Sequence, residues 1–127
     1  MPHTIQIYPA QRLARVVMTG VVTVQDVVGA LRDYTADPAW EPGFDRLWDA
    51  RGIRSLHLGP EDVAKIRSIW YERSAQIGDG RLALVTVREI DTSMAHLFRR
   101  LIHNTRVFAS IDEALAWLGK ALPARDS

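Results

Sequence analysis

The chain has 127 residues and a mass of 14.3 kDa, which is the size of one ordinary domain. Its balance of 47% hydrophobic and 24% charged residues excludes intrinsic disorder and fibrous proteins. Sixteen Lys and Arg residues against fifteen Asp and Glu residues give a net charge of +1, which does not indicate nucleic-acid binding. The absence of cysteine excludes disulfides and thiol chemistry.

Two short strands are predicted at the start of the chain. Residues 5–8 alternate apolar side chains and end at Pro9, and residues 13–19 are aliphatic and β-branched and end at Gly20. Because few residues separate the two strands, we expect them to pair as an antiparallel hairpin.

A helix and a third strand follow. Thr23 begins the helix, with Asp26 three residues later as in a capping box. Asp37 ends it, because the residue before a proline is driven out of the helical region. After a Pro-Gly turn, residues 44–49 form the third strand.

The second helix begins at Gly59-Pro60, since proline is favoured at the first helical position. Its apolar stripe continues to Ile77, and residues 78–80 (GDG) form a turn.

The last part of the chain predicts two strands and two helices. Residues 82–87 are apolar at almost every position, which is typical of a central strand covered on both faces. Residues 92–104 form a third helix and residues 105–109 the last strand. Ser110 starts the closing helix, with a glutamate three residues later as in a full capping box, and this helix ends near Pro123.

The predicted order is therefore β-β-α-β-α-β-α-β-α. Strands that alternate with helices indicate right-handed crossovers and a mostly parallel sheet, to which the first strand adds in antiparallel orientation. Sequential crossovers put the helices on one face, so a second copy of the chain could cover the other, and a homodimer is one expectation. We expect a single α/β domain over residues 1–127, with its core at 4–122 and a frayed tail at 124–127.

No motif for catalysis or metal binding stands out. The nitrogen ligands for a metal are His3, His57, His96 and His103, and no HExxH spacing joins them. The chain has no GxSxG elbow and no glycine loop with a Walker lysine. The sequence predicts no metal, no cofactor and no catalytic residue, and an enzyme site assembled in space remains an alternative.

Two features invite a binding role. His96, Arg99, Arg100 and His103 share the polar face of the predicted third helix, where they either complement the helix dipole or form a surface for an acidic partner. Trp40 lies in a proline-rich loop, where a core position is hard to explain, so it is a candidate lid or contact residue.

A family resemblance rests on several segments. Residues 106–118 (RVFASIDEALAWL) combine a short strand ending in Val-Phe with a capped helix that carries Glu-Ala and Trp-Leu. Asp37-Pro38, Pro42-Gly43 and the strand ending in Leu47-Trp48-Asp49 belong to the same pattern. Over residues 5–118, the chain resembles the SpoIIAA-like branch of the STAS domains, which are related to the Sec14-type fold.

The resemblance implies a parallel sheet covered by helices and a regulatory or binding role. STAS domains act as anti-sigma-factor antagonists, nucleotide-sensing modules or transporter tails, the Sec14-type fold holds lipids, and the SpoIIAA-like branch is associated with nonpolar ligands. The antagonists carry a phosphorylatable serine where the helix after the third strand begins. Here Leu58-Gly59-Pro60 occupies that place and Ser55 is the nearest hydroxyl, so the phosphorylation switch is in doubt.

Two functions follow as hypotheses. The first is a non-catalytic regulatory module that holds a small nonpolar or amphipathic ligand. The second is a protein-interaction module that uses the loops at the carboxyl ends of the parallel strands, where open α/β sheets usually bind. The candidate binding residues there are Asp49, Arg51, Arg54, Ser55 and His57 from one loop and Arg88, Asp91 and Ser93 from the next, together with Trp40.

The location of the protein is also predicted. The sequence does not open on a basic segment followed by an apolar one, and no apolar stretch approaches the roughly 20 residues of a membrane span. With no cysteine, the chain is expected to be cytoplasmic, without an integral membrane segment and without a nucleic-acid partner.

Overall fold

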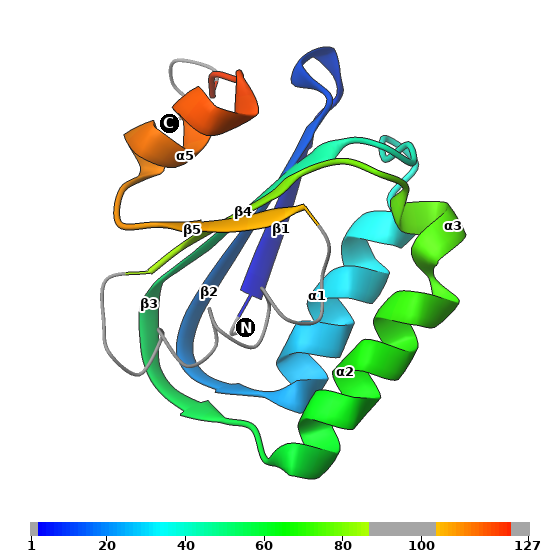
Figure 1. The fold of residues 1–127 in the computed structure, drawn as a ribbon, viewed down its shortest axis with the longest axis vertical. Coiled ribbons are helices and arrows are strands. Elements are labelled where there is room, and N and C mark those ends of the chain that lie inside the picture. The colour runs from blue at the N-terminus through cyan, green and yellow to red at the C-terminus, as the bar shows by residue number, and fades with distance from the viewer. Residues whose placement is uncertain (1–2, 87–103, 123–127) are drawn as a thin grey trace.

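A five-stranded sheet forms the centre of the computed structural model, which describes residues 3–86 and 104–122 (Figure 1). The strands lie in sequence order: β1 (His3–Tyr8), β2 (Leu13–Thr23), β3 (Asp45–His57), β4 (Leu82–Val85) and β5 (Thr105–Phe108). β1 pairs with β2 in antiparallel orientation, and every other pair is parallel. The predicted α/β class with an antiparallel first strand is confirmed.

The helices begin at the predicted residues. α1 (Val24–Ala36) follows Thr23, whose backbone N–H donates to the Asp26 carboxylate at 2.7 Å, and it ends before Asp37. α2 (Pro60–Glu72) begins after Gly59 in the same way, and α5 (Ile111–Leu118) begins where the Ser110 hydroxyl accepts from a backbone N–H. These side chains satisfy the free donors of each first turn.

Two helix ends differ from the prediction. The second helix is interrupted at Arg73, so the apolar stripe that continues to Ile77 belongs to a separate short helix, α3 (Ser74–Ile77). Elsewhere, a 3-10 turn, η1 (Pro9–Gln11), joins β1 to β2. α5 ends at Gly119 rather than near Pro123, because Gly119 adopts a left-handed conformation (φ 69°) that closes the helix. The predicted helix 92–104 lies outside the described residues except at its last position.

The middle strands are longer than predicted. β2 continues past Gly20, whose positive φ of 74° suits glycine, because its later residues pair with a matching extension of β3. The register shifts twice between these strands, so β3 carries extra residues and bends. As a result, residues 50–57, predicted as a loop, form the second half of β3.

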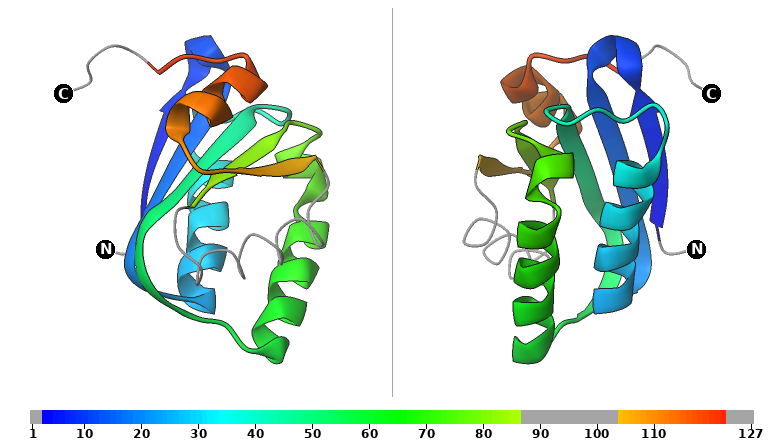
Figure 2. Two further views of the ribbon diagram at one scale, coloured as in Figure 1. Left: turned by 60° about the vertical axis from the view of Figure 1, so that its left-hand side comes forward. Right: turned by 90° about the vertical axis from the view of Figure 1, so that its right-hand side faces the viewer.

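Helices cover both faces of the sheet. α1 and α2 pack on one face, and α5 packs on the other against β3, β4 and β5 (Figure 2). Ala114 and Leu118 of α5 bury the apolar side chains Leu13, Leu47 and Val85 there. The expectation that all helices lie on one face is therefore wrong, and this part of the sheet needs no second copy of the chain to cover it.

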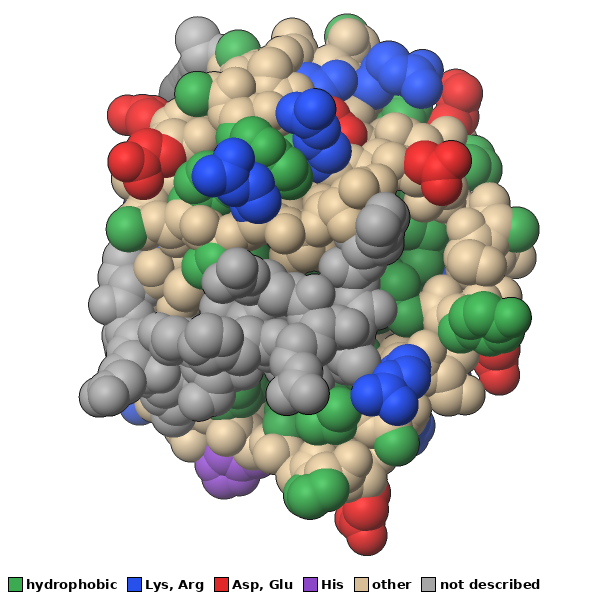
Figure 3. Space-filling model, in the orientation of Figure 1, with side chains coloured by type: hydrophobic (Ala, Val, Ile, Leu, Met, Phe, Trp, Pro, Cys, Tyr) green, Lys and Arg blue, Asp and Glu red, His purple; other side chains and the backbone are tan. Residues whose placement is uncertain are grey.

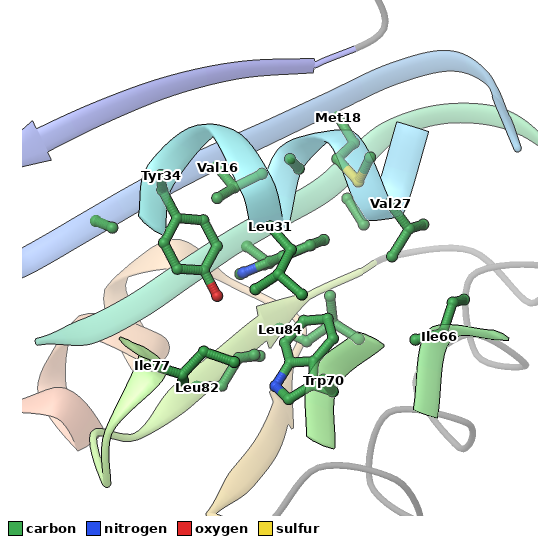
Figure 4. Close-up of a cluster of buried hydrophobic side chains, with 14 of the residues drawn as sticks. Val16, Met18, Val27, Leu31, Tyr34, Ile66, Trp70, Ile77, Leu82 and Leu84 are labelled. Atoms are coloured by element: carbon green, nitrogen blue, oxygen red, sulfur yellow. The ribbon is translucent and has the colours of Figure 1, made fainter. Parts of the chain in front are cut away.

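The main core lies between the sheet and helices α1 and α2 (Figure 4). Trp40 belongs to this core: it is 7% exposed, stacks edge-on against Tyr34 at 4.9 Å, and donates from Nε1 to the Gln76 carbonyl at 2.8 Å. The prediction of an exposed contact or lid residue is wrong here. The loop turns back over α1, and the indole finds both an apolar neighbour and an acceptor for its N–H.

Candidate functional site

The predicted binding residues on β3 form two separate pairs. Asp49 is 5% exposed and accepts two hydrogen bonds from the Arg51 guanidinium, at 2.9 Å from Nε and 2.8 Å from Nη2. These bonds hold the pKa of Asp49 below its ordinary value, although burial alone would raise it, and the carboxylate raises the pKa of Arg51. Most of the hydrogen-bonding capacity of Asp49 is therefore used within the chain.

The second pair lies further along the strand. The Ser55 hydroxyl and His57 Nε2 are 2.8 Å apart, and Arg54, directly before Ser55, is exposed. Ser55 and His57 follow Asp49 by six and eight residues, which at about 3.3 Å per residue is about 20–26 Å along the bent strand, so the structure does not bring the five predicted residues of β3 to one point. Arg88, Asp91 and Ser93 lie outside the described residues.

The basic cluster of the predicted third helix also lies outside the described residues, except for the nearby Arg106. Arg106 stacks on Phe108 and Trp117, with its guanidinium carbon 5.6 and 5.7 Å from the ring centroids. Arg81 stacks on Trp117 at 5.0 Å and donates to its carbonyl at 2.8 Å. The aromatic rings thus account for the positions of both arginines.

A pocket of about 220 Å³ lies at the opposite edge of the sheet, where parallel strands β3, β4 and β5 begin. Figure 3 shows hydrophobic side chains at the base of a hollow beside α2 and α3. One wall is apolar and comes from these helices, and the rest is polar backbone and side chain. The lining residues are Arg46, Trp70, Ser74, Ile77, Gly78, Asp79, Gly80 and Asn104.

The predicted turn Gly78-Asp79-Gly80 shapes one side of this pocket. A Cβ atom on Gly78 would lie 2.3 Å from the Gly43 nitrogen, and one on Gly80 would lie 2.3 Å from the Phe44 carbonyl oxygen. Only glycine allows two backbones to approach this closely. The turn is therefore pressed against residues 43–44, and its Gly80 carbonyl is brought to the base of the pocket.

Arg46 is the most unusual residue of the pocket. It is 1% exposed, on the second position of β3, and its Nη2 donates to the Gly80 carbonyl at 2.7 Å. Its Nε and Nη1 are also buried and have no hydrogen-bond acceptor among the described residues. Arginine stays charged inside proteins, so the pocket contains a buried positive charge with one neutral acceptor.

Tyr34 adds a second buried polar group nearby. Its hydroxyl points from α1 toward Ile77 and Leu82 in Figure 4, and it has no hydrogen-bond partner within residues 3–86 and 104–122. Complete burial raises the pKa of Tyr34, an effect that the neighbouring Arg46 charge opposes only in part. The phenol is therefore neutral and able to donate.

Strand alternation contains a signal for Arg46 that motif searching missed. Phe44, Arg46 and Trp48 lie at every second position, so they share the face that packs on α1 and α2. A charged residue between two buried aromatics on a core-facing strand is a marker of a functional site.

No group of three or more His, Asp or Glu side chains in the described part of the chain could hold a metal ion. Within the same residues, no helix is long and apolar enough to cross a membrane. The pocket is lined by Arg46, Asn104 and Ser74 beside an apolar wall, a composition that suits binding of a molecule with one polar and one apolar end.

Comparison with known proteins identifies the fold. No protein-family model matches the chain, and no curated protein matches its sequence. Among solved structures, it is similar to an uncharacterized DUF3478-family protein from Shewanella loihica PV-4 with a SpoIIAA-like fold, at a TM-score of 0.59 over 91% of each chain and 14% identity. The chain has a SpoIIAA-like fold. The fold implied by the sequence resemblance is thereby confirmed, and an identity of 14% carries the likeness no further than the fold.

Proposed function

We propose that this SpoIIAA-like domain is a non-catalytic binding module that holds a small amphipathic ligand in the pocket at the start of β3, β4 and β5. The observation that carries the proposal is the composition of the pocket. Trp70 and Ile77 provide an apolar surface, while Arg46, Ser74 and Asn104 provide polar groups. A concave site with an apolar wall and a few converging polar groups is the usual form of a small-molecule site.

The volume limits the ligand. A cavity of about 150 Å³ is enough for benzene, so about 220 Å³ accommodates one ring, or a short aliphatic chain, with a polar group attached. Sites for larger ligands range from about 300 to 1,000 Å³. The proposal is therefore for a small ligand and not for an intact two-chain lipid of the Sec14 type.

The test is native mass spectrometry of three freshly purified proteins: wild type, Ser74→Trp and Ser68→Trp. Ser74 is exposed and lines the pocket, so an indole there fills it; Ser68 is exposed on α2 and does not line it, which makes Ser68→Trp the matched control. We expect wild type and the control to carry an extra small mass that is lost on denaturation, and Ser74→Trp to lack it.

A bound mass retained by Ser74→Trp would place the ligand elsewhere and contradict the proposal. An apo mass for all three proteins, together with no binding of added apolar probes, would also contradict it. That second result would favour the protein-interaction alternative, for which Arg54 is the residue to reverse, because it is exposed on β3 and takes part in no ion pair within the described chain.

A further inference from the structure

Within the described residues, no acidic side chain neutralises the charge of Arg46. The guanidinium is buried at 1% exposure, and no carboxylate of residues 3–86 or 104–122 forms an ion pair with it. Among the residues that the structure describes, the uncharged Gly80 carbonyl accepts from Nη2, and the hydrogens on Nε and Nη1 have no acceptor. A buried cation of this kind is normally paired with an anion.

Neither the acidic residue beside Arg46 in sequence nor the one that lines the pocket fills this role. Asp45, beside Arg46 on β3, accepts from the Arg81 backbone N–H at 2.9 Å and pairs with Lys120 at 3.7 Å. Asp79 lines the pocket, but its side chain is exposed. Arg46 is one of the residues that line the pocket, and its Nε and Nη1 are covered in this structure, so an anion in the pocket contacts them only after the side chain moves slightly toward it.

Tyr34 is a buried, uncharged neighbour of Arg46. Its buried hydroxyl lies close enough to Arg46 for the two groups to interact electrostatically, and burial keeps it protonated by raising its pKa. The phenol oxygen can accept from the Arg46 guanidinium but carries no charge, so a ligand that brings oxygen atoms with negative charge is still favoured beside the two groups.

We propose that the ligand is a small monocarboxylate whose carboxylate group binds Arg46 and whose apolar part contacts Trp70 and Ile77. This inference rests on the proposed function and adds the charge class of the ligand. One guanidinium, with the Asp79 carboxylate at the rim, matches one negative charge better than the two of a phosphate monoester. The apolar wall and the volume of about 220 Å³ match a single ring or a short chain.

The test compares two probes of the same shape, benzoate and benzamide, by calorimetric titration of the wild-type protein. Both fit the pocket by size, and they differ in charge. We expect benzoate to bind roughly tenfold or more tightly than benzamide, because only the carboxylate makes charge-assisted hydrogen bonds to the guanidinium. Comparison of the two probes separates the charge preference from apolar binding.

Two variants assign that preference to Arg46. Arg46→Met keeps the length and bulk of the side chain and removes the charge, so the ratio of the two affinities should fall to about one while weak binding of both probes persists. Arg46→Lys keeps a positive charge and should keep a measurable preference, although it loses the planar donor arrangement. A purely structural role of Arg46 would not change the ratio between the probes.

The outcomes separate the inference from the proposed function. Equal binding of benzoate and benzamide by wild type, or a preference that survives in Arg46→Met, overturns the monocarboxylate and leaves the pocket as a binding site. A third outcome also overturns the monocarboxylate: wild type binds the two probes equally, and only Asp79→Asn prefers benzoate over benzamide. In that case the Asp79 carboxylate would itself be the partner of the Arg46 charge. Binding of neither probe overturns both proposals.

Discussion

Replacing Arg46 with methionine should make the protein more stable. The change removes one charged hydrogen bond, from Nη2 to the Gly80 carbonyl at 2.7 Å, which is worth about 1.5–3 kcal/mol. It also removes the buried Nε and Nη1, whose lack of an acceptor costs about 1–3 kcal/mol each. Methionine fills a similar volume, and replacing buried charges with well-packed apolar groups is neutral or stabilising by about 1–4 kcal/mol.

The net effect is a gain of about 2 kcal/mol in the free energy of unfolding. For a domain of this size, that raises the Tm by roughly 6–10 °C. Urea unfolding of the ligand-free proteins at pH 7 measures the difference, with Arg46→Ala as the control. Alanine removes the same charge but leaves a cavity, so it should be about 2 kcal/mol less stable than Arg46→Met.

A loss of 1 kcal/mol or more in Arg46→Met, measured without ligand, would refute this reasoning. It would mean that the guanidinium is well paired in the native protein and that the pocket does not need an anion.

Three further predictions concern the fold. Arg51→Gln should cost about 1 kcal/mol at pH 7, a value reduced by the exposure of Arg51. Because the Asp49–Arg51 pair lowers the folded-state pKa of Asp49, its contribution is present above the ordinary value of 3.8 and is lost as the pH falls through the lower folded value. In urea unfolding, the free energies of unfolding of Arg51→Gln and wild type should therefore differ less at pH 3 than at pH 7. An equal difference at the two pH values would contradict the pairing. Gly80→Ala should lower the free energy of unfolding by about 2–3 kcal/mol, because its Cβ would lie 2.3 Å from a backbone oxygen. The control Gly59→Ala, whose Cβ has its nearest atom at 3.8 Å, should lower it by less than about 0.5 kcal/mol. Equal decreases in Tm for the two variants would refute the close approach. Ser110→Ala should cost about 1 kcal/mol in thermal unfolding, because the hydroxyl accepts from the N–H three residues into α5 at 3.1 Å, and an unchanged Tm would show that the cap is dispensable.

The parts of the fold that follow from local chemistry were predictable. The capping residues Thr23 and Ser110 and the Asp37-Pro38 stop lie at helix ends because their effects act within one helical turn. The parallel orientation of β2 to β5 follows from the alternation of strands and helices, and their sequential order follows from the family resemblance.

Features that depend on distant parts of the chain were not predictable in the same way. Gly20 looks like the end of a strand, yet β2 continues because β3 pairs beside it. Trp40 looks exposed in its loop, yet Tyr34 and Gln76, which are near in space, bury it. Local propensity contains no information about these neighbours.

The candidate site was predictable only in part. Alternation along residues 44–48 places Arg46 on the core face, which the sequence alone indicates. The pocket beside it could not be predicted, because it needs the close approach of the Gly78–Gly80 turn to Gly43, and nothing in the sequence pairs these segments.

The most direct test of the account is an isotope-edited NOE experiment on the labelled protein with benzoate bound. The account predicts contacts from the aromatic protons of benzoate to the methyl groups of Ile77 and the indole of Trp70. Contacts to Trp117 on the other face of the sheet, or no contacts at saturating benzoate, would contradict the assignment of this pocket as the binding site.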